Sequence, residues 1–94
     1  MAAAEKGELM RFEGAVVKEQ GVTFGVLMVK RPVLRDATRR SEMRAFGTRA
    51  WGRMPIVLAA QDGSGRFEFQ GRRDIVNFLA SIDPARVPWA EWQV

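Results

Sequence analysis

The stretch MPIVLAAQDGSGRFEFQGRRDIVNFLASI, residues 54–82, decides the fold. It contains an apolar run, a turn, an alternating run and an amphipathic segment, in that order. Residues 55–60 carry no polar side chain, which predicts a strand covered on both faces. Asp62-Gly63-Ser64-Gly65 then suits a tight turn, because glycine adopts positive φ freely and aspartate bonds the backbone beyond it.

The second half of this stretch predicts a strand with one solvent-exposed face, followed by a helix. Phe67 and Phe69 alternate with polar side chains, as in a strand that buries one side. After Gly71 the apolar residues recur at helical spacing and form a single stripe. The helix is predicted to end at Asp83-Pro84, because the residue before proline avoids helical geometry.

The first half of the chain repeats the same order of elements without a visible sequence repeat. Residues 11–19 and 22–30 are rich in valine and phenylalanine, and Gln20-Gly21 between them suits a hairpin turn. The second run is apolar on both faces and is predicted to be a central strand, with the first at an edge. Asp36 is a candidate N-cap for a helix that runs to about Ala50, and Gly52 is its predicted stop.

The element order predicts an α+β fold, a two-layer β-β-α-β-β-α sandwich. A four-stranded, mainly antiparallel sheet would carry both helices on one face. We expect residues 1–8 to be a flexible N-terminus and residues 9–94 to be a single domain that includes a tryptophan-containing C-terminal tail. The doubly apolar strands leave one face of such a sheet bare, to be covered by the tail or by another copy of the protein.

Residues 53–82 resemble the C-terminal β-β-α end of thioredoxin- and glutaredoxin-like domains. The resemblance rests on a proline that opens the first strand, a glycine-containing turn and a glycine after the second strand. In that family the proline is cis and faces a paired-cysteine redox site, so the resemblance implies a cis Pro55. This chain has no cysteine. The resemblance therefore implies a redox-inactive thioredoxin-like domain.

Composition argues against catalysis. The chain has no histidine, cysteine or tyrosine, so the commonest general base, the thiol nucleophile and most transition-metal sites are missing. Asp62, Glu68 and Asp74 could share one neighbourhood and hold magnesium, but a turn aspartate, a surface glutamate and a first-turn helix aspartate are the favoured interpretation. We expect no enzyme activity, no cofactor and no metal.

The chain carries no sign of export or of membrane insertion. Its first residues are polar and lack the apolar region of a signal peptide. No apolar run approaches the roughly 20 residues that a membrane span needs. A cytoplasmic protein without a membrane partner is the expectation.

Positive charge is concentrated in residues 30–53, which carry eight lysine and arginine residues against two acidic ones. This segment has a net charge of +6 in a chain of net +4, so the remainder is net −2. Arginine suits bidentate contact with phosphate or carboxylate, and local basicity creates a directed field. The predicted anion-binding residues are Arg35, Arg39, Arg40, Arg44 and Arg49, with a second basic spot at Arg72 and Arg73.

These features predict a small binding module whose arginine-rich helix surface meets nucleic acid or an acidic protein. An arginine-rich composition is also typical of GC-rich bacterial genomes, and no helix-turn-helix, zinc-finger or RNA-recognition motif supports the nucleic-acid reading. The alternative is a protein-interaction or homodimerisation module, with Trp51, Trp89 and Trp92 as interface candidates. At the second basic spot, either Glu68 and Asp74 pair with the arginines or an anion binds there.

Overall fold

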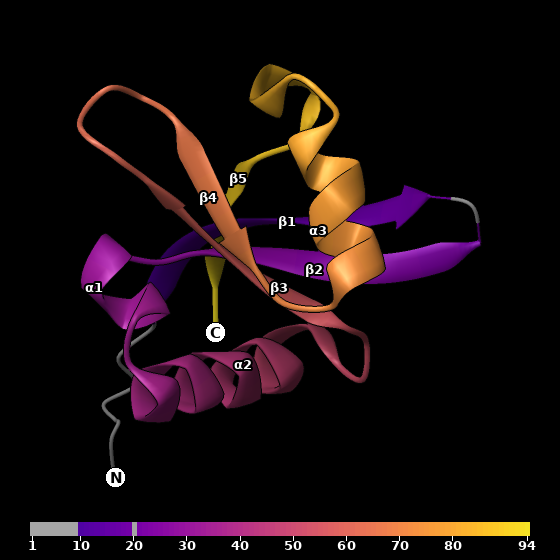
Figure 1. The fold of residues 1–94 in the computed structure, drawn as a ribbon. Helices are drawn as coiled ribbons and strands as arrows, with labels where there is room; N and C mark the ends of the chain where they lie inside the picture. The colour runs from indigo at the N-terminus through magenta and orange to yellow at the C-terminus, as the bar shows by residue number, and fades with distance from the viewer. Residues whose placement is uncertain (1–9, 20) are drawn as a thin grey trace, which may run out of the picture.

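The computed structural model describes residues 10–19 and 21–94, so the predicted flexible N-terminus lies outside the described residues. Figure 1 shows a single twisted sheet with helices on both sides. In chain order the elements are β1 Arg11–Glu19, β2 Val22–Met28, α1 Arg31–Leu34, α2 Ala37–Trp51, β3 Ile56–Gln61, β4 Phe67–Gln70, α3 Arg73–Ala80, the 3₁₀ turn η1 Pro84–Arg86 and β5 Ala90–Gln93.

The sheet has the strand order β4-β3-β2-β1-β5, which confirms β2 as the central strand. β2 and β3 are parallel, and the other three pairs are antiparallel. A parallel pair needs a crossover, and the connection through α1 and α2 supplies it. Buried residues run along both faces of β2 and β3, as their continuous apolar sequence predicts.

The two main helices lie on opposite faces of the sheet, so the prediction of a two-layer sandwich with both on one face is wrong (Figure 1). Ile75 and Leu79 of α3 pack with Phe24 and Val57 on one face. The α1 and α2 side chains pack on the other face with Leu27 and the even-numbered apolar residues of β3. The crossover from β2 to β3 places α2 on one side, and the β3–β4 hairpin returns the chain to the other.

The C-terminal tail forms a fifth strand, so the four-stranded prediction is also wrong. β5 pairs with residues 11–14 of β1, which are therefore not at the edge of the sheet. The indole of Trp92 fixes this strand by donating a 3.0 Å hydrogen bond to the carbonyl oxygen of Gly14. This segment of four residues is too short and too polar to be predicted as a strand from the sequence alone.

The short helix α1 was not predicted, because the sequence indicates a strand over residues 22–30 and a helix only from Asp36 onwards. Proline is well tolerated in the first turn of a helix, where its missing N–H has no intrahelical acceptor. Leu34 at the end of α1 is buried against the sheet. The turn thereby brings the start of α2 close to β3.

The predicted Asp36 cap, Gly52 stop and Asp62 turn are confirmed, whereas Gln20 of the predicted Gln20-Gly21 turn lies outside the described residues. The Asp36 carboxylate accepts the backbone N–H groups of Thr38 and Arg39 at 3.0 and 3.1 Å, which starts α2. Gly52 ends α2 with φ 90°, where a side chain would be strained. The Asp62 carboxylate accepts hydrogen bonds from the backbone N–H and the hydroxyl of Ser64 and from the backbone N–H of Arg66, which closes the β3–β4 turn.

Two glycines form the seat on which α2 ends. Gly14 and Gly25 both present their Cα atoms to the indole of Trp51, and a Cβ added at Gly25 would lie 2.4 Å from the Trp51 ring. They are not directly opposite each other, because Gly14 faces Leu27 across the hairpin. Both glycines therefore make room for the same side chain on one face of the sheet.

The bond before Pro55 differs from what the thioredoxin resemblance implies. The described peptide bonds contain no cis bond. The Pro55 carbonyl oxygen accepts a 2.9 Å hydrogen bond from the N–H of Gly25, so the residue extends the ladder between β2 and β3. Kinship with that family stays a prediction.

Candidate functional site

The cations of residues 30–53 lie on α1, α2 and the segments that flank them, and these elements form the layer on one face of the sheet (Figure 1). Two of the eight cationic side chains, Arg40 and Arg44, are half-buried. The other six are exposed: Lys30, Arg31, Arg35, Arg39, Arg49 and Arg53. The predicted basic surface therefore contains side chains of two kinds.

Arg40 and Arg44 are occupied by the protein itself. Arg44 donates to the carbonyl oxygen of Ile56 at 3.3 Å and to that of Gln70 at 3.1 Å, and it also donates to the Gln70 side-chain oxygen. Arg40 donates to the carbonyl oxygen of Leu34 at 2.7 Å. Burial and then the charge of Arg40 lower the pKa of Arg44. These two guanidiniums therefore tie α2 to α1, β3 and β4.

Arg35 and Arg39 make loose ion pairs at the surface. Arg35 lies 3.6 Å from Glu68, and Arg39 lies 3.9 Å from Asp36. All four side chains are about half exposed or more, and such pairs are usually worth less than about 1 kcal/mol. An incoming anion can therefore compete for both guanidiniums.

Three further arginines and Lys30 complete the exposed set. The Arg49 guanidinium lies 5.9 Å from the centre of the Phe46 ring, a cation–π contact that leaves its N–H groups free to donate. Arg31 lies near the β3–β4 turn. The Ser64 hydroxyl and the Arg66 N–H hold the pKa of Asp62 below its usual value, and the Arg31 charge adds to this effect. Arg53 follows the end of α2 and is exposed.

The second basic spot lies on the other face of the sheet, at the start of α3. Arg72 makes a bidentate contact with Asp74, with distances of 2.7 and 2.8 Å. Glu68 pairs with Arg35 instead. Arg73 is exposed. The structure thus separates Arg72 and Arg73 from the α2 cations and satisfies Arg72 internally.

We expect Asp74 to titrate near pH 2, because the Arg72 guanidinium lowers its carboxyl pKa to about 2. The folded pKa lies below the unfolded value of about 3.9. This pair therefore stabilises the fold above about pH 4, and the contribution is lost as the pH falls towards 2. A carbon-detected NMR titration of the carboxyl groups measures this pKa.

Neighbouring arginines provide the control for this titration. Arg72→Gln should return the Asp74 pKa towards its usual value, whereas Arg73→Gln should leave it low. An Asp74 carboxyl that titrates near pH 4 in the unaltered protein would contradict the bidentate pair.

The three tryptophans predicted as interface candidates all pack against other residues of the same chain. Trp51 lies edge-on to Trp92 and to Phe12, at ring-centre distances of 5.4 and 5.5 Å. Trp89 stacks on Phe67 at 5.5 Å on the opposite face and donates from its indole to a backbone carbonyl oxygen. Among the described residues, the Trp51 Nε1 is buried without a hydrogen-bond partner. The half-buried rings secure the tail to the sheet.

The carboxylates considered for metal binding have separate protein partners. Asp62 closes its turn, Glu68 pairs with Arg35 and Asp74 pairs with Arg72. Within residues 10–19 and 21–94, no three acidic side chains converge in a way that would hold a metal ion. The described helices also include none with the length and apolarity needed to cross a membrane.

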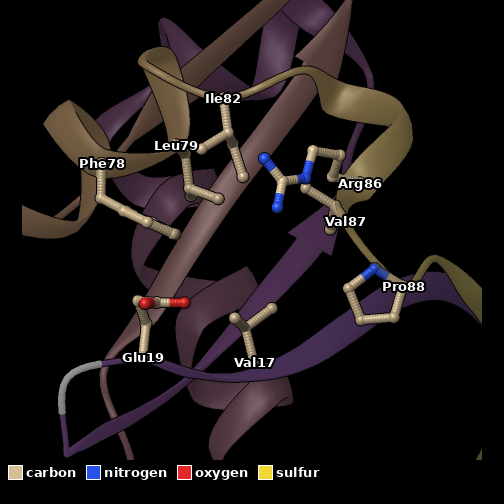
Figure 2. A pocket seen from close by; sticks show the side chains of 8 residues that line it. All are labelled: Val17, Glu19, Phe78, Leu79, Ile82, Arg86, Val87 and Pro88. Atoms are coloured by element: carbon tan, nitrogen blue, oxygen red, sulfur yellow. The ribbon is translucent and has the colours of Figure 1, made fainter.

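The sequence reading missed a cavity of about 230 Å³ between α3 and β1, shown in Figure 2. Its wall combines apolar side chains with Glu19 from the end of β1 and Arg86 from η1. These two charged residues are far apart in the chain, and neither belongs to a motif. The sequence carries no signal for this cavity, because the folding of the tail over the sheet is what brings them together.

The chain was compared with protein-family models, with curated proteins and with solved structures, and no match was found in any of the three comparisons.

Proposed function

We propose that this protein binds a nucleic acid through the exposed cations of the α1–α2 layer. The observation that carries the proposal is the separation of the basic side chains into two groups. Arg40 and Arg44 are held by backbone carbonyls, while Lys30, Arg31, Arg35, Arg39, Arg49 and Arg53 remain at the surface of the same layer. These exposed cations can make phosphate contacts without disturbing the fold.

The electrostatics of this layer support a polyanionic partner. The segment that forms it is net +6, and the rest of the chain is net −2. Neutralisation of successive phosphates by such a surface releases counterions and gives affinity that does not depend on sequence. We expect the protein to bind single-stranded or duplex nucleic acid with little sequence preference.

The test is fluorescence anisotropy with a labelled RNA and a labelled DNA duplex, titrated at several salt concentrations. Arg35→Gln with Arg49→Gln should weaken binding to both probes. This double variant should also lower the slope of log affinity against log salt by about 2, because each lost phosphate contact removes about one unit. Neither residue makes a buried contact in the protein, so the fold should be retained.

The matched control is Arg11→Gln with Arg73→Gln, which makes the same change of net charge on exposed residues outside the α1–α2 layer. This control should keep the affinity and the salt slope. An equal loss in both double variants would mean that net charge alone drives binding and would refute a defined surface. Binding of an acidic peptide in preference to both nucleic acids would assign the surface to a protein partner instead.

A further inference from the structure

The cavity beside α3 is bounded on one side by the end of β1. Val17 and Glu19 from β1 face Phe78 and Ile82 of the α3 region across it, and the guanidinium of Arg86 is turned towards Ile82 on the far side (Figure 2). A smaller cavity of about 130 Å³ adjoins it, since Glu19 and Phe78 line both. Together they form a groove with a mainly apolar lining between α3 and the sheet, and Val17 and Glu19 at the end of β1 line its larger part.

The edge of β1 next to this groove has no strand paired with it among the described residues. Met10 and Val94 exchange two backbone hydrogen bonds of 3.0 and 3.1 Å. Because bonding alternates along an antiparallel strand, the even-numbered residues of β1 direct their N–H and C=O groups towards β5. The ladder with β5 ends at Gly14, so Val16 and Lys18 direct theirs to the open edge.

An added strand would place alternate side chains into the groove. An extended peptide that continues the antiparallel direction of β5 would exchange hydrogen bonds with Val16 and Lys18. Its residue opposite Val17 would direct its side chain to the same face as Val17, into the cavity. The residue two positions earlier in the peptide would lie opposite Glu19.

The groove is closed at one end by the protein's own tail. β5 begins opposite Gly14, so an added strand cannot extend far beyond the position opposite Val16. A peptide that ends there would place its terminal carboxylate beside the cavity whose wall includes Arg86. Glu19 and Arg86 are both exposed, and neither makes an ion pair within residues 10–19 and 21–94.

We propose that this groove binds the free C-terminus of another protein as an added strand. The ligand has an apolar residue in the penultimate position, for the cavity, and a lysine or arginine two residues earlier, for Glu19. Arg86 receives the terminal carboxylate. This site lies on the opposite face of the sheet from the α1–α2 layer and does not depend on nucleic-acid binding.

The test uses the synthetic peptide Gly-Ser-Gly-Lys-Ser-Leu-Gly with a fluorophore at its N-terminus, measured by anisotropy. The free acid should bind, and the C-terminal amide should bind at least about tenfold more weakly because a charge-assisted contact is lost. Replacing the peptide lysine by glutamate should weaken binding to a similar extent. Amide NMR shifts on binding should cluster in residues 16–19 and in α3.

Two variants assign the ends of the ligand. Arg86→Gln should abolish the difference between the acid and the amide. Glu19→Lys should reverse the preference, so that the glutamate peptide binds better than the lysine peptide. Arg73→Gln and Glu42→Lys make the same changes of charge on exposed residues outside the groove and should leave both preferences unchanged.

Several results would overturn this proposal. Equal binding of acid and amide, or a Glu19→Lys variant that still prefers the lysine peptide, would each do so. Failure of the unaltered protein to bind the free acid at millimolar concentration would also overturn it. NMR shifts confined to α1 and α2 would assign peptide binding to the basic layer. Concentration-dependent dimerisation through β1, detected by light scattering, would identify a second copy as the occupant.

Discussion

Replacing Gly25 by alanine is expected to lower the free energy of unfolding by about 2–3 kcal/mol, at the upper end of the range for overpacking a core. The added Cβ would lie 2.4 and 2.5 Å from two carbon atoms of the Trp51 ring. Atoms at these distances overlap, so the indole or the end of α2 must move. Urea denaturation monitored by circular dichroism measures the loss.

The indole has little freedom to move. Phe12 and Trp92 lie edge-on to it at 5.5 and 5.4 Å, and Gly14 forms the second half of its seat. A displaced Trp51 would press on the strand pair that holds the tail. The cost of Gly25→Ala therefore arises from the whole cluster rather than from one contact.

A double-mutant cycle separates this clash from any intrinsic effect of alanine in a strand. Trp51→Leu shortens the side chain and should lower stability by itself. In the Trp51→Leu background, Gly25→Ala should cost much less, with a coupling energy of about 1–3 kcal/mol between the two sites. Equal costs in both backgrounds would contradict the packing described here.

Gly63→Ala is the matched control for this substitution. Gly63 lies in the β3–β4 turn, and a Cβ added there would meet no atom of the described residues within 4 Å. We expect a change in stability of less than about 0.5 kcal/mol.

Replacing Arg44 by methionine should lower the free energy of unfolding by about 2–3 kcal/mol, because it removes half-buried hydrogen bonds from a charged donor to β3 and to Gln70. Arg44 donates to the carbonyl oxygens of both Ile56 and Gln70. Methionine preserves the apolar stem of the side chain, so the loss of stability measures the contribution of the guanidinium group. Thermal and urea denaturation measure it.

Lysine at the same position should recover a part of this stability. A single ammonium group retains the charge but lacks the planar fork that reaches two acceptors at once. Arg49→Met, in the same helix, removes an exposed guanidinium that makes no such bonds and should change stability by less than about 0.5 kcal/mol. A similar loss at both positions would mean that Arg44 does not bridge the strands.

The backbone contacts of Arg40 and Arg44 also decide which residues can be used to test the basic surface. Because Arg40 and Arg44 hold backbone carbonyls, their joint replacement would change folding and binding together. The exposed pair Arg35 and Arg49 provides a cleaner test of anion binding. The spacing of the arginines along α2 gave no way to distinguish these two groups.

The local elements of this protein could be predicted because each depends on contacts between near neighbours. The apolar run in β3, the alternation in β4 and the stripe of α3 all appear where the sequence places them. The Asp36 cap and the Asp62 turn depend on side chains that reach only two to four residues along the chain. A short stretch of consecutive residues is therefore enough to predict such interactions.

The layers and the fifth strand could not be predicted in this way. A helix stripe shows that one side is buried, but it does not say which face of the sheet receives it. The sequence of β5 is too short to distinguish a strand from a loop. The segment becomes a strand because it pairs with β1. Both outcomes depend on pairings between residues far apart in the chain.

The sequence by itself determined the identity and order of the main elements, their caps and turns, and the concentration of charge in residues 30–53. Only the tertiary structure decided which arginines remain exposed, that two glycines seat an indole, and that Glu19 and Arg86 line the same cavity. The physical reason is the distance along the chain over which each interaction acts. Turns, caps and periodic burial arise within a few residues, whereas the availability of a charge or an edge depends on what the distant chain packs against it.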